Sequence, residues 1–579
     1  MAEVITPYIK IKGSNLPANT MSKLENIEVD SSMGYPDSCT IAFIDTDSLD
    51  LIDSTYTIGD EIEVLFEGVV AGQSPKTVFK GEITSITPEF RDDFSATFVI
   101  KGYDKRHRLM RGTKTAAYIN VKDSDIVSKI VGAAGLRASV DSTGIVREHV
   151  LQDNQTDLDF LHQLARRNGY VMSFDGTTLS FKKPATSGNI PLSWGEGLIA
   201  FRPRLSAARQ VQEVIVLGWD PKTQKQIRGN KSSSKNSPKI GLGKTGVQIS
   251  SVFGNAKRIV VHQPVADAKE ADALAQAILD KIESEYIEAE GLAIGNPDLL
   301  AGKIVKIDKI GKRFSGTYHI TSAKHYLQNG IYETEFRVEG ATPYLLGGIF
   351  DTGEQHSSSN YPEWTGIYTA VVTNNNDPDK LGRVKVKYPW FSNDVESNWV
   401  RVIIPGAGKS RGSFWVPQVN DEVLVAFEHG NFNYPYVLGG LYSTKYPPMS
   451  DIGSSSKDVV TKKVWRSESG HILLMDDAKD SKKIELQTAD GHVLTLDDKN
   501  KKIELKTKGG KGIVIDDQGN KITVSGPNTI EIKSNGGITI QGNGSVTVKG
   551  NGSVSVEGAT VEVKGKGSVK VTAPMIQIG

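Results

Sequence analysis

The chain has 579 residues, and its 68 lysines and arginines are balanced by 68 aspartates and glutamates. This length predicts three or more domains, and the zero net charge argues against recruitment of nucleic acid or anionic membrane by a strong overall field. The single cysteine, Cys39, excludes an intrachain disulfide, and the sequence contains neither a signal-peptide pattern nor about eighteen consecutive apolar residues.

The first 344 residues alternate strand-like and helix-like stretches. Residues 77–90 alternate apolar and polar side chains, which is typical of a barrel or sandwich strand. Helices are predicted where a capping residue precedes an apolar stripe, at residues 123–135, at 156–168 with His162 on the polar side, and at about 267–287. We therefore expect two β-rich units around an α/β insert, in one domain that spans residues 1–345.

Polar stretches predict the boundaries of the remaining parts. Residues 224–238 form a basic segment without an aromatic side chain, which we interpret as a mobile surface loop with no assigned role. Residues 346–362 read as a linker. After it we expect a barrel domain at 363–447, a neck at 448–465 and a needle at 466–579. Turn sequences such as 376–379 separate four or five short strands in the barrel domain, which predicts a small closed barrel.

A repeat with paired aspartates follows: SGHILLMDD, DGHVLTLDD and GKGIVIDD. The aspartate pairs invite an acid/base interpretation, and the histidines a metal interpretation. These residues are Asp476, Asp477, Asp497, Asp498, His471 and His492. Because equivalent residues recur in each unit, we interpret the aspartates as turn formers that cap backbone N–H groups. We expect no catalytic residue, metal site or cofactor.

Near the C-terminus, pairs of valine or isoleucine recur about every eight residues, separated by polar, glycine-rich links. Each pair offers an apolar face only two side chains wide, from which no globular core can be built. A period of eight is also too short for one chain to go round a closed coil. We therefore expect three parallel chains to form a prism with a dry interior. The predicted trimer core comprises Ile530, Ile532, Ile538, Ile540, Val546, Val548, Val554, Val556, Val561, Val563, Val569 and Val571.

Two other interpretations of this repeat are a flexible Gly/Ser linker and a calcium-binding solenoid. Linkers do not keep apolar residues in register over about six units. No aspartate occurs between Pro527 and Gly579, which argues against calcium ligands.

The barrel domain carries the most specific sequence pattern. Its motif residues are Asp377, Pro378, Gly382, Arg383, Pro389, Trp390, Asp421, Glu422, His429 and Gly430. With these residues the chain resembles the VgrG proteins, the spike subunits of contractile injection systems, and the related phage baseplate hub and spike. The resemblance extends to KGYDKRHRLMR at residues 101–111 and QDNQTDLDFLHQLARRNGY at 152–170.

This resemblance implies a mainly β fold with an α/β insert: a hub of two tube-like β-barrels, an OB-fold barrel, and a C-terminal trimeric β-helix (β-prism) needle. It implies a homotrimer that joins a hexameric ring of inner tube protein to baseplate proteins and mechanically punctures the target cell envelope on firing, without enzymatic activity. The predicted tip residues, Met575, Ile576, Ile578 and Gly579, would bind a separate cap, because no histidine follows His492 to form the His-x-His iron site of some phage needles. The expected cap is a PAAR-type tip protein.

Other classes of protein were weighed against this interpretation. The H-E-x-x-H motif of metal-dependent proteases is absent. A nucleic-acid-binding barrel is suggested by Arg383, Lys385, Lys387, Trp390, Trp399 and Trp415. A trimeric fibre or adhesin is the third alternative, although no receptor-binding head follows the repeat. We expect no specific nucleic acid partner. We also expect synthesis in the cytoplasm without a signal peptide, followed by assembly into an extracellular, phage-tail-like particle or a phage.

Overall fold

The computed structural model describes residues 6–46, 49–67, 74–185, 188, 190–220, 222–236, 238–261, 263–340, 364–390, 392–449 and 460–578. The chain divides into two compact units, which we call unit 1 (Met1–Tyr442) and unit 2 (Ser443–Gly579). Among the helices of the described residues, none is both long and apolar enough to cross a lipid bilayer. The linker predicted at 346–362 lies outside the described residues.

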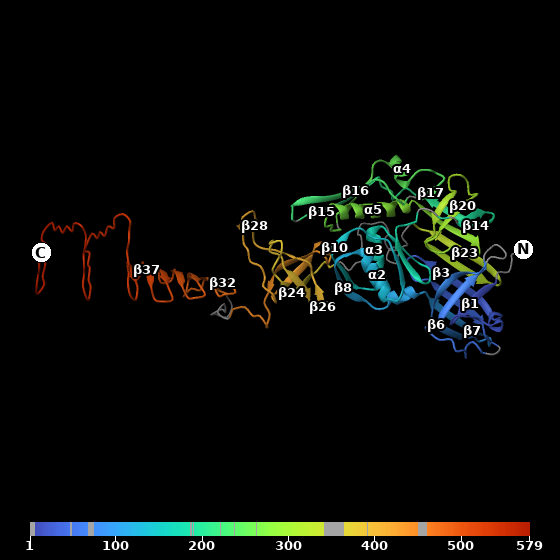
Figure 1. Cartoon of the computed structure of the whole chain (residues 1–579), viewed down its shortest axis with the longest axis horizontal. Coiled ribbons are helices and arrows are strands. Elements are labelled where there is room, and N and C mark those ends of the chain that lie inside the picture. The colour runs from blue at the N-terminus through green and yellow to red at the C-terminus, as the bar shows by residue number, and fades with distance from the viewer. Residues whose placement is uncertain are drawn as a thin grey trace. The chain divides into compact units, whose positions relative to one another are not determined.

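A sheet of fifteen strands dominates the hub in the described part of unit 1 (Figure 1). Its first half has the order β3-β4-β7-β6-β5-β1-β2. These strands are β1 (Pro7–Ile11), β2 (Ser14–Asn15), β3 (Leu24–Ser32), β4 (Ser38–Ile44), β5 (Glu61–Phe66), β6 (Lys76–Phe90) and β7 (Ala96–Tyr103). Two short helices, α1 (Ala18–Met21) and η1 (Lys105–Met110), accompany this half. β6 confirms the strand predicted at residues 77–90.

The second half of the sheet has the order β17-β21-β20-β13-β14-β19-β23-β22. These strands are β13 (Ile190–Trp194), β14 (Gly197–Leu205), β17 (Lys239–Ile240), β19 (Ile287–Ile294), β20 (Ile304–Asp308), β21 (Gly316–His319), β22 (Ser322–Gln328) and β23 (Ile331–Val338). β22 pairs with β3 and so joins the two halves. The prediction of two β-rich units is confirmed, and the structure adds that they share one continuous sheet.

Each half of the sheet packs around its own apolar core. The first core includes Ile27, Ile41 and Phe66, and the second includes Tyr318 and Phe336. Tyr332 of β23 crosses to the first core, where its ring stacks on Phe66 with centroids 4.1 Å apart. This stacked pair ties the two halves together at the level of side chains as well as backbone.

An α/β insert has two parts, of which the first lies between the two halves of the sheet in sequence and the second lies between β14 and β19. Its first part contains β8 (Lys114–Lys122), α2 (Asp123–Ala133), β9 (Arg137–Val140), β10 (Val146–Gln155), α3 (Asp157–Asn168), β11 (Val171–Phe174) and β12 (Thr178–Lys182). The predicted limits of α3 are confirmed: Thr156 Oγ1 accepts a hydrogen bond from the Asp159 N–H at 3.1 Å, and Gly169 ends the helix at φ +65°. His162 is half-buried, as are Gln163 and Arg166 on the polar side of α3, so its predicted placement holds. Burial against other elements nevertheless lowers the pKa of the imidazole to about 3.

The second part of the insert is a three-stranded sheet with one long helix. It contains β15 (Glu213–Asp220), β16 (Lys225–Lys231), α4 (Gly246–Ser250), η2 (Ser251–Phe253), β18 (Lys257–Val260) and α5 (Ala268–Ser284). Asp267 caps α5 by accepting the Glu270 N–H at 2.7 Å, which agrees with the predicted helix start. Ala271 and Ala275 of α5 pack on Val214 and Val216 of β15.

The OB-type domain completes unit 1. It contains β24 (Ile367–Asn374), β25 (Lys385–Tyr388), β26 (Ser392–Glu396), β27 (Arg401–Val402), β28 (Ala407–Gly408), β29 (Arg411–Gly412), β30 (Glu422–Phe427), η3 (Glu428–Gly430) and β31 (Pro435–Leu441). The strands pair in the order β26-β25-β24-β30-β31-β27. A bridge between Val384 and Val400 then connects the start of β25 to the start of β27. The ring of pairings is therefore closed, as the predicted barrel requires.

The barrel core continues into the insert. Leu151 of β10 and Ala117 of β8 pack in the same cluster as Val386 and Val425. The Trp364 indole N–H donates to Asp153. These contacts dock the OB-type domain on the sheet of β8 and β10.

Unit 2 contains one antiparallel sheet of seven strands in sequential order within its described residues. The strands are β32 (Lys462–Arg466), β33 (Ile472–Asp476), β34 (Lys483–Gln487), β35 (Val493–Asp497), β36 (Lys502–Lys506), β37 (Gly512–Asp516) and β38 (Lys521–Ser525). β32 begins four residues before the predicted needle, inside the predicted neck. Residues 526–578 form neither helix nor strand in the single chain.

Candidate functional site

One face of the unit 2 sheet carries two parallel columns of apolar side chains. Consecutive strands place these residues directly opposite one another, because each hairpin keeps the same register. The first column is Trp465, Leu473, Leu486, Leu494, Leu505, Ile513 and Val524, and the second is Met475, Ile484, Leu496, Ile503, Ile515 and Ile522. Most of these side chains are exposed in the single chain. This face is an apolar stripe two side chains wide, with no cover in the described residues.

The opposite face carries a column of alternating charge, which we call the charge ladder. The ladder comprises, in order across the sheet, Lys462, Asp476, Lys483, Asp497, Lys502, Asp516 and Lys521. Lys502 Nζ lies 3.5 Å from Asp516 Oδ2. Every charge between the two end strands has an opposite charge across from it on both neighbouring strands, so the ladder favours this register over any that places like charges opposite each other.

The aspartates of this ladder also hold the turns. Asp476 accepts hydrogen bonds from the Ala478 N–H at 3.0 Å and from Ser481 Oγ at 2.7 Å. Asp497 accepts from the Asn500 N–H at 2.8 Å, and this bond lowers the pKa of Asp497. The interpretation of Asp476 and Asp497 as turn formers is confirmed.

The histidines of the repeat are also engaged in the turns. His471 Nδ1 accepts from the Ala489 N–H at 3.1 Å, and the His492 N–H donates to Thr488 Oγ1 at 3.1 Å. Over the residues that the structure describes, no cluster of three or more His, Cys, Asp or Glu is placed to hold a metal ion.

The valine and isoleucine pairs of residues 530–571 are exposed in a regular pattern. The first residue of each pair, from Ile530 to Val569, is 52–55% exposed, and the second, from Ile532 to Val571, is 66–73% exposed. Residues 526–578 form no backbone–backbone hydrogen bond with the described part of the chain. Both the apolar side chains and the peptide groups of this segment therefore lack partners within one copy.

The predicted tip residues are exposed as well. Met575 and Ile578 are among the most exposed apolar side chains of the described residues, and Ile576 is also exposed. Gly579 lies outside the described residues.

In the OB-type domain, the motif residues Asp377, Pro378, Gly382 and Arg383 form one loop. Arg383 donates from Nε and Nη2 to the two oxygens of Asp377, at 3.0 and 2.7 Å. The same carboxylate accepts the N–H groups of Asp379, Leu381 and Arg383. The Arg383 guanidinium and these N–H groups hold the pKa of Asp377 well below its usual range.

Backbone geometry accounts for the glycine of this loop. Gly382 has φ +72°, and a Cβ atom there would lie 3.0 Å from the Phe414 ring. Pro378 is exposed at the turn. This loop is a fixed structural element rather than a catalytic constellation.

The remaining motif residues lie at the ends of strands. Pro389 and Trp390 follow β25, and the Trp390 indole N–H donates to the Thr369 carbonyl at 2.6 Å. Asp421 accepts the Gln418 N–H at 2.8 Å, immediately before Glu422 starts β30.

His429 and Gly430 form the turn after β30, where both have positive φ. The Gly430 carbonyl accepts the Trp364 N–H at 3.0 Å. The ten motif residues thus form several separate turns and do not converge on one pocket.

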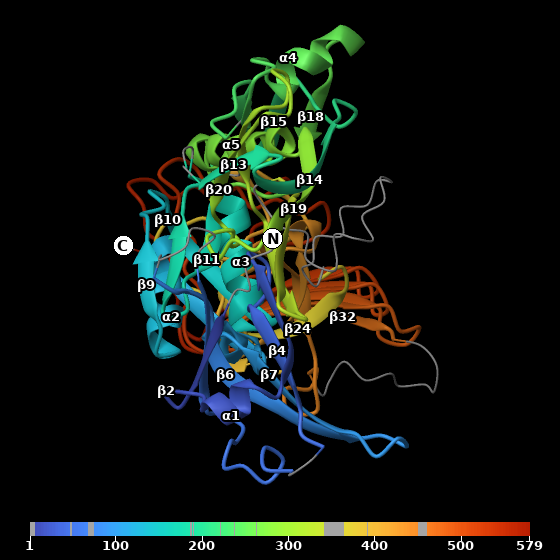
Figure 2. The same cartoon turned by 90° about the vertical axis from the view of Figure 1, so that its right-hand side faces the viewer.

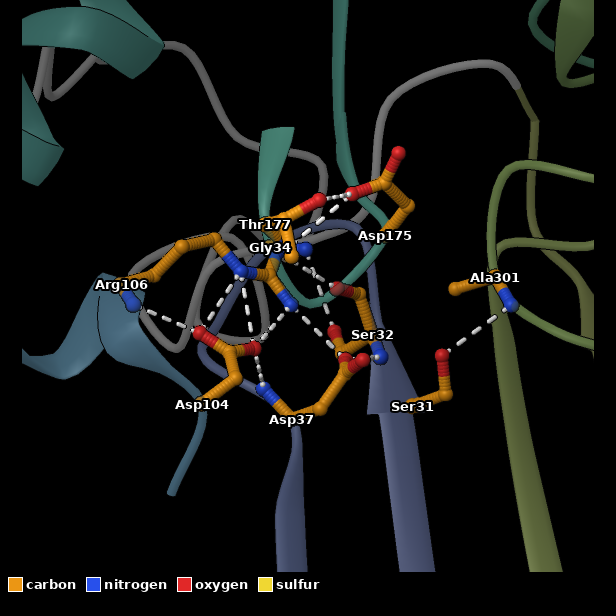
Figure 3. Close-up of polar contacts among 9 residues, drawn as sticks. All are labelled: Ser31, Ser32, Gly34, Asp37, Asp104, Arg106, Asp175, Thr177 and Ala301. Atoms are coloured by element: carbon orange, nitrogen blue, oxygen red, sulfur yellow. Dashed lines mark hydrogen bonds and ion pairs between the residues drawn. The ribbon is translucent and has the colours of Figure 1, made fainter. Parts of the chain in front are cut away.

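A buried charge cluster in the hub was not predicted from the sequence (Figure 3). Arg106, which is 4% exposed, donates to both oxygens of Asp104 and, through Nη2, to Asp37 Oδ1 at 2.8 Å. Its Nη1 donates to the Ser32 carbonyl at 3.0 Å. Burial raises the pKa of Asp37 to about 7, against the opposing effect of Arg106.

This cluster joins three separate parts of the hub. Ser32 and Asp37 flank the β3–β4 turn, and Asp104 caps η1 by accepting the Arg106 N–H at 2.7 Å. The Arg106 guanidinium also lies over the Phe174 ring of β11, 5.4 Å from its centroid. The D-x-R spacing of KGYDKRHRLMR contains two members of the cluster, Asp104 and Arg106. The third member, Asp37, is 67 residues from Asp104, so local sequence does not reveal it.

Comparison with known proteins now places these features. Residues 368–442 match the family model of the type VI secretion system/phage-baseplate injector OB domain. The actin cross-linking toxin VgrG1 of Vibrio cholerae is 25% identical over 364 residues, which are 59% of this chain and 33% of that protein. The type VI secretion system spike protein VgrG3 of Vibrio cholerae is 24% identical over 369 residues, covering 59% of this chain and 35% of that protein. The chain thus spans about a third of the length of these relatives.

Among solved structures, a chain of the lidded Francisella PdpA–VgrG complex superposes with a TM-score of 0.52. The match covers 87% of this chain and 80% of that chain at 12% identity, and it supports the fold. In sequence and in fold the chain is similar to spike proteins of the VgrG type. It belongs to the family whose model is described as the Alg8 N-terminal domain, which matches residues 1–329, more than half of its length.

Proposed function

We propose that this protein is the homotrimeric central spike and hub of a contractile injection system. The observation that carries the proposal is the regular exposure of twelve valine and isoleucine side chains between Ile530 and Val571, on a segment without backbone partners. An isolated chain does not keep such a surface in water, because both the apolar groups and the peptide groups gain from pairing with other copies.

The energetics favour a shared prism of three chains. Fully burying a valine or isoleucine side chain contributes about 1.5–3 kcal/mol before conformational entropy is subtracted. With three copies, tens of these side chains become buried, and the extended segments gain interchain hydrogen bonds. The apolar stripe of the unit 2 sheet adds a second surface of the same width for the same partners. The product is a stiff rod.

A stiff rod acts by mechanical force. We propose that the hub in unit 1 binds the hexameric ring of the inner tube and baseplate proteins, and that the C-terminal segment is driven through a target envelope. The supporting observations are the closed barrel and the fifteen-stranded hub sheet of this chain, together with its sequence similarity to a VgrG spike protein. On this proposal the chain needs no catalytic residue, and it works inside an extracellular, phage-tail-like particle or a phage.

The tip requires a further partner. Met575, Ile576 and Ile578 leave an apolar end in the described chain. Three copies would present these side chains together as a small apolar platform. We propose that a PAAR-type tip protein caps it. A variant carrying Met575→Asp and Ile578→Asp should lose co-purification with such a cap while retaining the mass of the parent.

Light scattering after size-exclusion chromatography of the full chain tests the trimer. We expect three times the chain mass under native conditions. A mass equal to one chain would contradict the prism and would favour the alternative of a nucleic-acid-binding barrel. A dimer or tetramer would retain self-association but exclude three-fold matching to a six-fold tube.

A further inference from the structure

One face of the three-stranded sheet of the insert packs against α5. Its order is β16-β15-β18, with β18 parallel to β15 (Figure 2). Val214, Val216 and Ile227 point to α5, which in turn contacts α3 (Figure 1). This sheet therefore forms the outer layer over α5, and its second face points away from the insert core.

The second face has an apolar centre. Because side chains alternate along a strand, Ile215, Leu217 and Trp219 of β15 share this face with Ile259 of β18. Trp219 is 54% exposed and Ile259 is 58% exposed. Ile215 is outside the α5 cluster, in agreement with this placement, and is itself buried. Ile259 pairs with Ile215, four residues before Trp219, so the two exposed side chains lie at separate points of this face.

β18 is also an open edge of this sheet. It is the last strand in the pairing order, and no other described residue forms a backbone hydrogen bond with its outer side. Every residue from Ser251 to Ile259 is exposed, including Val252 and Phe253 of η2. An edge strand that is neither covered nor paired offers a row of N–H and C=O groups to an added strand.

Charge distinguishes this surface from the rest of the chain. Ten lysines and arginines and only two acidic residues lie between Arg209 and Val261, in a protein with no formal net charge. On the open face, Lys257 and Arg228 lie near a single carboxylate, Glu213, whose pKa they lower together with Asn230. Lys257 Nζ is 2.7 Å from Glu213 Oε2. One acid shared between two cations leaves this face with excess positive charge.

We propose that β18 accepts an acidic, extended segment of another protein as an added β-strand. In the bound state, an apolar side chain of the added strand packs beside Ile259, and a carboxylate of the added strand pairs with Lys257. Backbone hydrogen bonds to the outer side of β18 supply the general affinity, and the alternation of acid and apolar side chains supplies the selectivity.

A second copy of β18 is a poorer occupant of the same edge. Antiparallel pairing of two such strands would bring Lys257 and Arg258 of one copy close to the same residues of the other. Like charges across a strand pair are destabilising. This proposal also does not depend on the C-terminal prism, because every residue that it uses lies in unit 1.

Two short synthetic peptides test the proposal on the full-length protein. In one, glutamate alternates with valine; in the other, lysine alternates with valine. We expect the acidic peptide alone to bind, and to slow amide hydrogen exchange at residues 257–261. Ile259→Lys and Lys257→Glu should each weaken its binding at least about tenfold. Ile119→Lys is the matched control, because Ile119 is also 58% exposed and lies on β8.

The other outcomes overturn the proposal. Equal binding of the two peptides, or binding that survives Ile259→Lys, would show that β18 does not select an acidic strand. Failure of both peptides to bind would contradict strand addition. Protection of residues 257–261 that rises with protein concentration, without peptide, would assign the edge to a second copy of this chain.

Discussion

Arg383 and Asp377 form a two-point ion pair in which Nε and Nη2 of the arginine each donate to a different carboxylate oxygen, at 3.0 and 2.7 Å. The aspartate at the same time accepts three backbone N–H groups of its own loop. This one carboxylate therefore fixes both the path of the loop and the entry into β25, next to the bridge that closes the barrel.

Replacing Asp377 with asparagine should destabilise the OB-type domain by roughly 2 kcal/mol, since one oxygen of a charged, multiply bonded acceptor becomes a donor. The pKa of Asp377 is lowered by folding, so its contribution is present above its unfolded pKa and is lost as pH falls through the folded value. The difference in Tm between the parent and Asp377→Asn, measured by calorimetry, should therefore shrink in acid.

A matched variant tests whether the loss of stability comes from the Asp377 carboxylate itself or from any removal of a charge in this loop. Asp379→Asn removes a nearby carboxylate that is more exposed and accepts one arginine contact, at 2.8 Å. We expect a much smaller change in Tm. Equal losses from the two variants would contradict the assigned role of Asp377.

The charge ladder predicts a register effect in unit 2. Lys502 faces Asp497 on one neighbouring strand and Asp516 on the other. Lys502→Asp places three carboxylates in a row, and we expect the Tm of unit 2 to fall by a few degrees. Because these side chains are partly exposed, added sodium chloride should reduce the difference.

Lys506→Asp is the control for the ladder. It reverses the same charge on the same strand and face, but its cross-strand neighbours are Val493 and Gly512. A salt-sensitive loss of Tm confined to Lys502→Asp supports the ladder. Similar losses of Tm from both variants would show that net charge, and not the ladder, causes the change.

Local sequence predicted the elements whose signals are local. The capping residues Thr156 and Asp267 and the stop at Gly169 marked two helices, since each acts on backbone groups within one turn. The Val/Ile pairs as the interior of a trimer stay a prediction, because the single chain shows only that these side chains are exposed.

Long-range pairing could not be predicted in the same way. The junction of β22 with β3 joins segments that are hundreds of residues apart, and the capture of Asp37 by Arg106 depends on that sheet. Local periodicity gives the polar side of α3 for His162, but it does not show that the β3–β4 turn and Arg106 lie near this side chain and bury it. A single chain likewise does not contain the interior of the predicted prism, because the surfaces that would cover the Val/Ile pairs belong to other copies of the chain.

The buried cluster gives a prediction that distinguishes its two aspartates. Asp37 uses only Oδ1, which accepts from the Ser32 N–H and from Arg106 Nη2. Asp104 uses both oxygens. The single carbonyl oxygen of asparagine can accept both hydrogen bonds that Asp37 accepts, but it cannot replace the two acceptor oxygens of Asp104. We expect Asp37→Asn to fold normally and Asp104→Asn to lower the Tm clearly. Arg106→Met should cost about 3–5 kcal/mol, since it leaves two buried carboxylates without a cation.

The pH dependence of the same cluster has a defined sign. Because folding raises the pKa of Asp37 to about 7, the stability of the parent should fall as pH rises from about 4 to about 7 through this group. Asp37→Asn removes that loss, so its Tm relative to the parent should increase between pH 5 and pH 8. A constant difference over this range would show that Asp37 is ionised in the folded protein throughout.

The last prediction concerns the inside and outside of the C-terminal repeat. Val546 and Val548 share one side of an extended strand, and Thr547 lies on the other. In a three-chain prism, aspartate at both valine positions would bury several carboxylates around one axis, which costs several kcal/mol even after partial protonation. We expect the double variant Val546→Asp/Val548→Asp to lose the trimer mass in light scattering, or to lose it at a much lower temperature.

Thr547→Asp adds the same charge on the outer side and should keep the mass and Tm of the parent. The comparison depends only on which way the side chain faces, since all three positions lie within one repeat. If the double variant retains a trimer as stable as that of Thr547→Asp, the valine pairs do not form the interior. The stiffness attributed to the rod would then need another source.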